Sequence, residues 1–439
     1  MMKKTVLVSL IFFVSGVSAL AQNRLVNEVK KEISGMTLTV DNYKNSLKKI
    51  NKSLEHEETK EKAETWWIAG KIQYSIYDKM MANKAVGDKI NSTEAGMALI
   101  DGYDKLQVAL LKDTIIVVDK RGNPIIDKKT GKAKYKTKYS QEIMNKVVSH
   151  IIDYSAVAGD FFLAEDWSNA YKAWDIYCST AQSVWAVKKK VNEPDSVIGY
   201  NRFYQGLAAY QNKDYEKAVE QLANARNLGY RKKALYDAWI DALIKQQDTI
   251  YLVSVAHEAH DMLGAKDPRY VRILINHYLK AKNYDEASTL LNEVIKNDST
   301  VAEYYDLKGR LAEIQENIDA ALPFYRKAVD LNPDFGMALF DLGNALYNKA
   351  IINNEHRSQE ALKLYDEALP YLEKAHKLMP HNENAKKVLS RIYYVTGSKK
   401  IEIESLNKLE IFTILSLEIT SEFFILLDKS EYNLDKKSK

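Results

Sequence analysis

Few residues in this chain have the type and spacing that chemistry on a substrate would need. His257 and His260 lie three residues apart, so a helix would bring both imidazoles to one face, where they could hold a metal ion. The spacing differs from the HExxH pattern of zinc proteases and no third ligand is apparent, so two surface histidines are the simpler interpretation. The sequence therefore predicts no metal site and no cofactor.

The other motifs that could carry chemistry are weaker. The stretch 330–336 is similar to a calcium loop, but its glycine comes one place late and Pro333 interrupts it. Gly122 and Gly131 lie too far apart for a phosphate-binding loop. Cys178 is the only cysteine, so no intramolecular disulfide can form, and we expect it to pack as a small apolar residue. We therefore expect no enzymatic activity.

Composition places the chain among ordered, helix-rich proteins. Hydrophobic residues make up 46% of its 439 residues, charged residues 28%, and there are only seven prolines. The net charge of +4 falls to +2 if Lys3 and Lys4 are removed with a leader, so no global field favours nucleic acid as a partner.

The beginning of the chain has the pattern of a secretory signal peptide. A short basic start precedes an uncharged, mostly apolar run over 5–20, and Ala19 and Ala21 are small residues suited to cleavage. We therefore expect residues 1–21 to be removed, with Gln22 as the new N-terminus, and the protein to be exported and periplasmic, cell-envelope associated or secreted. A retained anchor is the alternative, but this run is marginal for spanning a bilayer, and no membrane span is expected after cleavage.

A 34-residue period organises most of the chain. Gly309 recurs as Gly343 at this spacing, and AALPFYRKAVDLNP at 320–333 recurs as EALPYLEKAHKLMP at 367–380, after 47 residues. The larger spacing equals one period plus thirteen residues, which predicts an insertion near 350–365. Self-similarity at this period is typical of stacked helical repeats, in which each unit packs only against its neighbours.

Each repeat unit has the pattern of two amphipathic helices. Apolar residues three and four apart in FGMALFDLGNALY predict the first helix, and a second apolar-periodic segment predicts its partner. Glycine inside a helix costs about 1 kcal/mol relative to alanine, so its recurrence indicates close approach to an alanine of the partner helix. The expected structural positions, which include the prolines that end each unit, are Gly206, Ala218, Gly309, Ala321, Ala328, Pro333, Gly343, Ala368, Ala375 and Pro380.

Two further features affect the second helices. Pro323 and Pro370 occupy the same place within the second helix of their units. Because proline removes an N–H and crowds the preceding turn, we expect a late helix start or a local bend at both. The thirteen-residue insertion is expected to lengthen both helices of its unit.

These patterns resemble the tetratricopeptide repeat family. The unit AEYYDLKGRLAEIQENIDAALPFYRKAVDLNP has Tyr305, Gly309, Tyr325 and Pro333 where the family pattern has an aromatic, a glycine, an aromatic and a terminal proline. The resemblance extends from about residue 151 to 380, and together with the expected signal peptide it indicates an exported, bacterial-type member. It implies an all-α solenoid of stacked antiparallel helix pairs, whose first helices line a concave groove that binds a protein or peptide.

The lining of such a groove should come from first-helix residues that are not structural. Arg272 and Asn276 resemble the basic and amide pair with which some family members clamp a C-terminal carboxylate, but Leu307 stands where that clamp has an asparagine, which argues against C-terminal capture. Aromatic and arginine side chains are typical interface anchors. The predicted partner-binding residues are Tyr200, Phe203, Tyr210, Arg269, Arg272, Asn276, Asp306, Arg310, Phe340, Asn344 and Tyr347.

The expected domain order has four parts after the signal peptide. Degenerate repeat-like helices occupy 22–113, a basic β-hairpin insertion 114–140, the repeat array 141–397, and a capping helix with a polar tail 398–439. The insertion could bind an anionic partner, or its alternating lysines could simply protect an exposed strand edge. The apolar segment 401–428 could cover the last repeat, or mediate self-association or contact with a membrane surface.

The sequence therefore predicts a non-catalytic scaffold that binds a protein or peptide partner in the cell envelope. The alternative is a glycan- or nutrient-binding accessory module on the same scaffold, because the chain has 28 tyrosines and six tryptophans. The identity of the partner cannot be read from the residues.

Overall fold

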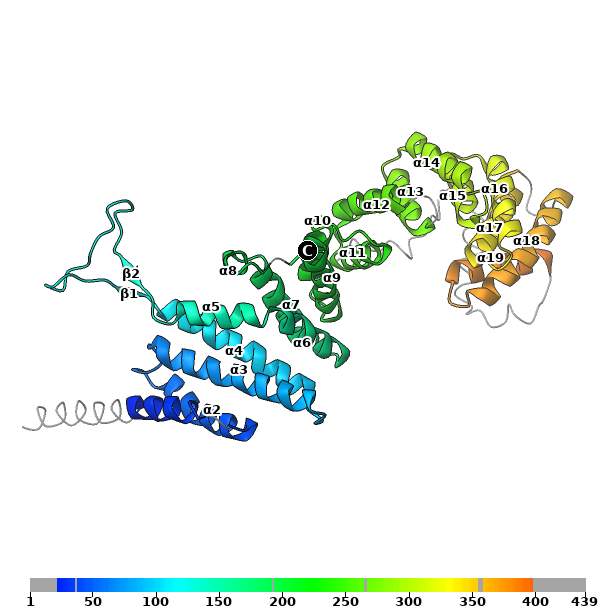
Figure 1. The fold of residues 1–439 in the computed structure, drawn as a ribbon. Helices are drawn as coiled ribbons and strands as arrows, with labels where there is room; N and C mark the ends of the chain where they lie inside the picture. The colour runs from blue at the N-terminus through cyan, green and yellow to red at the C-terminus, as the bar shows by residue number, and fades with distance from the viewer. Residues whose placement is uncertain (1–21, 36–37, 192, 264–266, 354–357, 398–439) are drawn as a thin grey trace, which may run out of the picture. The chain divides into compact units, whose positions relative to one another are not determined.

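The computed structural model describes residues 22–35, 38–191, 193–263, 267–353 and 358–397 (Figure 1). The chain divides into two compact units, Met1–Val255 and Ala256–Lys439, which are described separately below. The predicted signal peptide, 1–21, and the predicted capping helix and tail, 398–439, lie outside the described residues, as does the apolar segment 401–428.

Unit 1 is built of helices with one small antiparallel sheet between α4 and α5. Residues 22–32 are also helical, and consecutive long helices pack against one another, with α4 also touching α6 and α7 touching α9. The elements are α2 (Val40–Glu55), α3 (Ala63–Ala85), α4 (Ser92–Lys112), β1 (Ile115–Ile116), β2 (Tyr135–Lys136), α5 (Ser140–Ser149), α6 (Ile151–Leu163), α7 (Trp167–Ala181), α8 (Val184–Lys188), α9 (Asp195–Gln211), α10 (Tyr215–Asn227) and α11 (Lys233–Gln246).

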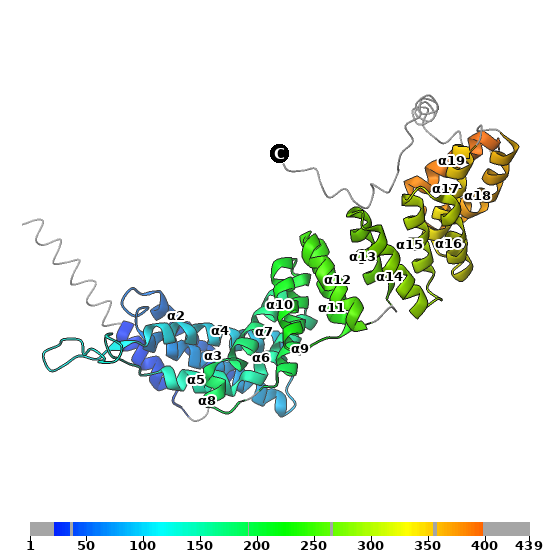
Figure 2. The ribbon, with the colours of Figure 1, turned by 90° about the horizontal axis from the view of Figure 1, so that it is seen from above.

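Unit 2 is a stack of helix pairs, which Figures 1 and 2 show side by side. Its elements are α13 (Pro268–Lys280), α14 (Tyr284–Asn297), α15 (Ala302–Ile314), α16 (Ile318–Leu331), α17 (Gly336–Asn353), α18 (Gln359–Leu378) and α19 (Glu383–Thr396), and the boundary between the units falls within α12 (Thr249–Leu263). The fold is thus an all-α solenoid of antiparallel helix pairs, as predicted. The helices α17 and α18 span 18 and 20 residues against 13 and 14 for α15 and α16, which confirms that the insertion lengthens both.

A recurring turn joins the first and second helices of a pair. Lys213, Gln247 and Glu316 each have a positive φ, of 62°, 64° and 59°, and each is followed by an aspartate or asparagine. At all three turns the next side chain accepts a hydrogen bond from a backbone N–H of the following helix: Asp214, Asp248 or Asn317. Such a cap satisfies an otherwise unpaired donor at the helix start. The left-handed residue is therefore compensated by the cap that follows it.

The glycines of the first helices allow close packing against the second helices, as predicted. The side chain that each glycine contacts differs from the prediction. A Cβ on Gly309 would lie 2.5 Å from the Tyr325 ring, and a Cβ on Gly343 would lie 2.5 Å from Leu372 Cγ. The expected partner was an alanine, but a large side chain of the second helix fills the space that glycine leaves open. The alanines at the structural positions are fully buried beside these contacts: Ala218, Ala321, Ala328, Ala368 and Ala375.

The prolines fall into two groups. Pro333 and Pro380 each stand two residues after the last residue of α16 and α18, which confirms that they follow the ends of second helices. Pro323 and Pro370 lie inside those helices, which begin five and eleven residues earlier, so the expectation of a late helix start is wrong at both. Both prolines are exposed, which leaves the unpaired carbonyl of the preceding turn near solvent. A local bend at each stays a prediction.

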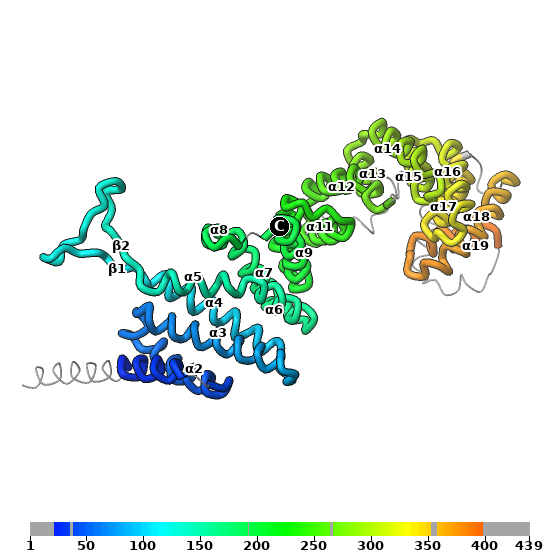
Figure 3. The backbone as a smooth tube through the Cα atoms, in the orientation of Figure 1, coloured from blue at the N-terminus to red at the C-terminus, as the bar shows by residue number. Residues whose placement is uncertain are grey.

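The basic insertion branches instead of forming a simple hairpin (Figure 3). β1 pairs with β2 in the stem, and two isolated bridges, Val118 with Pro124 and Ile126 with Ala133, form two arms. The arms end in turns at Gly122 and Gly131, where φ is 85° and 67°. At the branch point three backbone hydrogen bonds of 2.7–2.8 Å form a closed ring. The N–H of Val117 donates to the C=O of Lys134, the N–H of Lys134 donates to the C=O of Ile125, and the N–H of Ile125 donates to the C=O of Val117. The predicted strands and both turns are present, and the branching is the new feature.

Asp113 anchors the base of this insertion. Its buried carboxylate accepts hydrogen bonds from the backbone N–H groups of Lys138, Tyr139 and Ser140 and from Ser140 Oγ, at 2.7–3.0 Å. Burial alone would raise the pKa of Asp113, but these donors outweigh it and hold the pKa below its ordinary value. The Tyr139 ring in turn packs on Trp67 of α3, with 4.7 Å between ring centroids.

Replacing Asp113 by asparagine is expected to loosen this base, because a neutral amide accepts the N–H groups more weakly than a carboxylate does. Hydrogen exchange at the amides of 138–140, relative to the intrinsic rate, should accelerate about 10-fold or more at neutral pH. The pKa of Asp113 is lower in the folded state than in the unfolded chain, so its ionised form stabilises the fold. In the wild type this stabilisation is full above about pH 4, the pKa of an unfolded aspartate, and is lost as the pH falls through the folded pKa of Asp113. Asp119→Asn, in an exposed turn, serves as the control, and unchanged protection in Asp113→Asn would contradict the anchoring role.

None of the helices in the described part of the chain has the length and apolar character needed to span a bilayer.

Candidate functional site

The first helices of unit 2, α13, α15 and α17, lie next to one another and present equivalent residues in rows. Residues 34 apart occupy equivalent places, and residues four apart share one face of a helix. We call the surface formed by two such rows the first-helix face. One row is Arg272, Asp306 and Phe340, and the other is Asn276, Arg310 and Asn344.

An ion pair joins α13 to α15 at one end of this face. Arg272 Nη1 lies 3.0 Å from Glu303 Oε1, and the arginine side chain is 52% exposed while the glutamate is 19% exposed. Exposed ion pairs of this kind contribute little to stability. Arg272 therefore remains accessible to a partner that offers a carboxylate or a carbonyl oxygen.

A buried charge cluster joins α15 to α17 at the centre of the face. Arg310 Nε donates to Asp341 Oδ2 at 2.6 Å and lies 3.3 Å from Asp306 Oδ2. Asp306 is almost fully buried, and its Oδ1 makes no hydrogen bond within the described residues. Burial, and then the neighbouring Asp341, raise the pKa of Asp306 well above its ordinary value, so its carboxyl group retains its proton more readily. Asp341 is also the main cause of the raised pKa of Arg310.

Glu313 extends the cluster to a third helix. Its carboxylate accepts hydrogen bonds from Tyr325 Oη of α16 at 2.9 Å and from Asn348 Nδ2 of α17 at 3.2 Å. Burial raises the pKa of Glu313, while these two donors oppose that shift. The three helices are thereby held together by directional polar contacts as well as by apolar packing.

Two side-chain amides flank the charge cluster without internal partners. Asn276 of α13 and Asn344 of α17 are half-buried, and neither side chain makes a hydrogen bond within the part of the chain that the structure describes. Each offers one acceptor and two donors, the complement of a peptide backbone. Phe340, four residues before Asn344, is partly buried against the core of unit 2 and can offer an apolar contact beside them.

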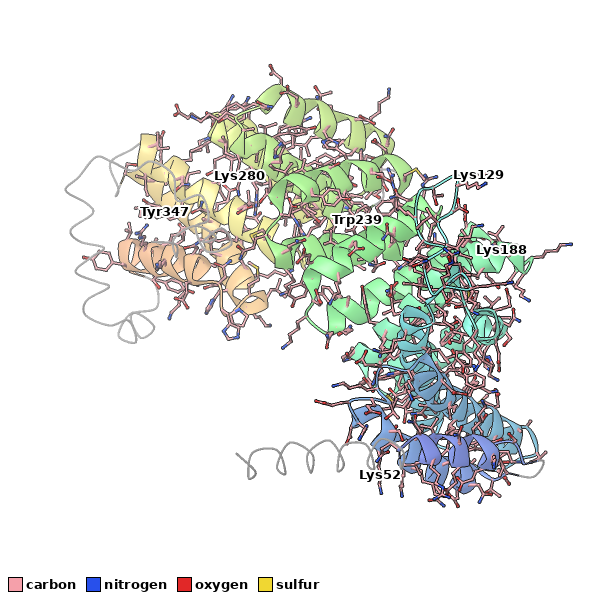
Figure 4. The ribbon with its side chains drawn as sticks, turned by 90° about the vertical axis from the view of Figure 1, so that its left-hand side faces the viewer. Lys52, Lys129, Lys188, Trp239, Lys280 and Tyr347 are labelled. Carbon is pink, nitrogen blue, oxygen red and sulfur yellow. The ribbon has the colours of Figure 1, made fainter. Side chains whose placement is uncertain are left out.

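Three of the predicted partner-binding residues are wrongly assigned, because the structure buries them. Phe203 is 5% exposed, since the Tyr230 ring stacks on it at 4.8 Å between centroids. Tyr347, labelled in Figure 4, is 8% exposed and its ring lies 5.8 Å from that of Tyr365. Asp306 is 2% exposed and belongs to the charge cluster. None of these side chains is accessible to a partner, so Asp306 belongs to the first-helix face by its position in the row and not by contact with a partner.

Three of the predicted residues, Tyr200, Phe203 and Tyr210, belong to unit 1, and the others belong to unit 2. Tyr200 is 47% exposed and its ring contacts those of Tyr204 and Tyr230. Tyr210 is half-buried and its ring lies 5.5 Å from that of Tyr215. In unit 2, Arg269 is half-buried in the first turn of α13, beside its cap Asp267, which accepts from its backbone N–H. The structure thus divides the predicted set between two units.

The residues considered for chemistry are engaged in packing. His257 Nε2 lies 3.2 Å from Tyr278 Oη, and burial lowers the pKa of this histidine. Cys178 is fully buried, and burial raises the pKa of its thiol to about 12, which disfavours the reactive thiolate. Across the described ranges no group of three or more histidine, cysteine, aspartate or glutamate side chains could hold a metal ion.

Sequence reasoning missed Asp341 and Asn348, which complete the charge cluster. Asp341 is equivalent by repeat position to the buried apolar Leu307, so the pattern gave no reason to pair it with Arg310. The sequence did contain evidence for this contact. Asp341 stands where the preceding unit has an apolar residue, and a buried aspartate requires a charged or hydrogen-bonding partner. Arg310 on the neighbouring helix is that partner.

Comparison with known proteins identifies the repeats. A family model described as tetratricopeptide repeat matches residues 273–334 and 307–375. The uncharacterized protein ycf37 of Cyanophora paradoxa is 29% identical over 119 residues, which are 26% of this chain and 62% of that protein. This chain thus spans less than two thirds of the length of that relative.

Solved structures with a similar arrangement of helices include three proteins at low identity. The pilF protein of Pseudomonas aeruginosa is 14% identical, with a TM-score of 0.39, and the match covers 51% of this chain and 100% of that one. The C-terminal part of a TPR repeat-containing protein from Cytophaga hutchinsonii is 15% identical, with a TM-score of 0.37 and coverage of 60% and 95%. YrrB, described as a TPR protein with an unusual peptide-binding site, is 14% identical, with a TM-score of 0.32 and coverage of 46% and 96%.

Proposed function

We propose that this chain, whose residues 273–375 match a tetratricopeptide repeat family model, is a non-catalytic scaffold that binds an extended segment of a partner protein on the first-helix face. Repeats of this family generally mediate protein–protein interactions, and stacked helical repeats offer extended binding surfaces. The proposal places the binding site in unit 2 and includes export to the cell envelope, which rests on the sequence of residues 1–21.

The observation that carries this proposal is the pair of unbonded amides, Asn276 and Asn344. They stand at equivalent places two first helices apart, so at about 10 Å between neighbouring helix axes they are separated by about 20 Å. An extended chain rises about 3.3 Å per residue, so a segment of roughly six residues would bridge them. Asparagine can bind both the N–H and the C=O of such a segment, which anchors it without reading its sequence.

The residues around the two amides would supply selectivity. Arg272 is exposed at one end and favours an acidic side chain, while Phe340 near the other end favours an apolar one. The buried ion pairs between them hold the helices in register, so that the rows of binding residues are preorganised. The favoured partner is therefore an extended segment with an acidic residue and an apolar residue about six positions apart.

Replacing Asn276 and Asn344 together by alanine is expected to weaken partner binding about 30-fold, because each lost side-chain amide contributes about 1 kcal/mol net of its hydration. The partner is recovered by affinity purification with the full chain, identified by mass spectrometry, and titrated against purified wild type and variant. Asn297→Ala with Lys327→Ala, two exposed changes on second helices, is the matched control. Equal affinities of the wild type and the Asn276/Asn344 variant would refute the proposed site.

A glycan- or nutrient-binding role is the second candidate, favoured by the half-exposed Tyr200 ring beside Tyr204 and Tyr230 in unit 1. Exposed aromatic rings can stack on sugars as well as on peptide side chains. Calorimetry separates the two roles, because a glycan-binding module would release heat with glycans that Tyr200→Ala abolishes.

A further inference from the structure

The branched insertion concentrates positive charge on a thin projection from unit 1 (Figures 1 and 3). Between residues 114 and 138 it has eight basic and two acidic residues, a net charge of +6. All eight basic side chains are exposed, and Lys129 is labelled in Figure 4: Lys120, Arg121, Lys128, Lys129, Lys132, Lys134, Lys136 and Lys138. The two acidic carboxylates, Asp119 and Asp127, face inward to backbone N–H groups of their own turns. The charge that the insertion presents outward is therefore almost purely positive.

The same projection exposes apolar side chains that nothing in unit 1 covers. Its arms are too thin to bury both of their faces. The exposed apolar side chains are Ile115 (41%), Ile116 (47%), Val118 (50%), Ile125 (37%), Ile126 (52%) and Tyr135 (56%). Exposed β-branched residues at this density on a soluble surface indicate a contact site.

Hydrogen bonds and side-chain packing hold the insertion in a defined conformation. The ring of three backbone hydrogen bonds holds its branch point, and an aspartate turn closes each arm. At its base, Asp113 and the Tyr139–Trp67 contact hold it to the helices. Its basic and apolar side chains are therefore presented in a defined arrangement.

We propose that this insertion binds the surface of an anionic lipid bilayer, with its lysines at the headgroup phosphates and its isoleucine, valine and tyrosine side chains in the interfacial layer. A bilayer surface takes both kinds of side chain at once, because lysine heads reach phosphates while apolar groups enter the acyl boundary. An acidic protein would satisfy the charges but would need a matching apolar surface around each isoleucine. The interleaved sequence Lys-Ala-Lys-Tyr-Lys at 132–136 favours the bilayer. This contact is separate from the first-helix face and does not depend on it.

The test uses a fluorophore on the insertion, so that membrane contact elsewhere in the full chain does not interfere. Cys178 is buried with a raised pKa, so the thiol introduced by Ile126→Cys takes a polarity-sensitive NBD label selectively. A label on Val86→Cys, 81% exposed at the opposite end of the antiparallel α3–α4 pair, is the positional control. Vesicles of phosphatidylcholine with phosphatidylglycerol should increase and blue-shift the emission at 126 and not at 86, and salt should reduce the effect. Vesicles of phosphatidylcholine alone should have no effect.

Charge and apolar variants then separate the contributions. Lys132, Lys134 and Lys136 changed together to glutamine should raise the half-saturating lipid concentration on the order of 100-fold, at about 1 kcal/mol per lysine. The matched control changes the exposed Lys79, Lys84 and Lys89 to glutamine, which removes the same charge at the far end of the α3–α4 pair and should have little effect. Ile116→Ser with Tyr135→Ser should raise it about 10-fold. Unchanged hydrogen exchange at 138–140 shows that each variant retains the base of the insertion.

Three results would overturn the proposal. No change at position 126 with anionic vesicles would show that the lysines only protect a strand edge. An equal loss of vesicle affinity in the Lys79/Lys84/Lys89 control would show that the net charge of the protein, and not the insertion, directs binding. A response to soluble polyglutamate equal to that with vesicles, and unaffected by the Ile116/Tyr135 changes, would identify an acidic protein as the partner.

Discussion

Gly309→Ala is expected to destabilise unit 2 by about 2–4 kcal/mol, although alanine is the better helix former. The new methyl group would lie 2.5 Å from the Tyr325 ring, far inside van der Waals contact. That ring cannot move away freely, because Tyr325 is fully buried and its hydroxyl donates to Glu313 at 2.9 Å. The helix pair α15–α16 must therefore separate or its hydrogen bond must break.

Urea unfolding followed by circular dichroism measures this effect, with hydrogen exchange to assign the loss to unit 2. Gly159→Ala in α6 is the matched control, because a methyl group there meets no atom within 4 Å. This change should leave stability unchanged or increase it by about 0.5–1 kcal/mol. Equal effects of the two substitutions would show that Gly309 is not needed for close packing.

Arg310→Ala is expected to destabilise unit 2 by about 3 kcal/mol at neutral pH. The arginine neutralises two carboxyl groups on neighbouring helices, and its removal leaves Asp341 facing the buried Asp306 without a counter-charge. The pKa of Asp306 is raised in the folded state, so its protonated form favours folding. This contribution to the free energy of unfolding is full below about pH 4, the pKa of an unfolded aspartate. It is lost as the pH rises through the folded pKa of Asp306. The loss in the variant should accordingly be larger at pH 7 than near pH 4.

Two further variants check this interpretation of Arg310. Arg326→Ala removes an arginine of the same unit whose ion pair with Glu367 is exposed, so it should cost no more than about 0.5 kcal/mol. Adding Asp341→Asn to Arg310→Ala should restore part of the stability, since it removes the unpaired charge. A loss in Arg310→Ala that is independent of pH and not relieved by Asp341→Asn would contradict the electrostatic account.

The repeat itself could be predicted because it depends on local rules. Helix amphipathicity, a helix-ending proline such as Pro333 and a small residue such as Gly309 leave signatures at fixed spacing, and the structure confirms each. The family of the repeats followed from the same residues. The group that occupies the space beside Gly309 could not be predicted, because it depends on the rotamer of Tyr325 on another helix.

The candidate site was only partly predictable, for a physical reason. Equivalent repeat positions share a place on the helix but not an environment. Arg272 is exposed while Asp306, one period later, is buried, because Arg310 and Asp341 close over it. Phe203 is covered by Tyr230 from the turn after α10, a contact that the helical pattern does not encode. Likewise the branching of the insertion depends on hydrogen bonds among three segments, whereas its turns depend only on local glycines.

The central claim is that the first-helix face of unit 2 contacts a protein partner. Its most direct test is photo-crosslinking in the native cell with benzoylphenylalanine placed at Phe340 of α17, or at Phe324 on the second helix α16. The account predicts a single crosslinked partner from position 340, lost when Asn276 and Asn344 are alanine, and no such product from 324. Equal crosslinking from both positions, or a partner captured only from 324, would contradict it.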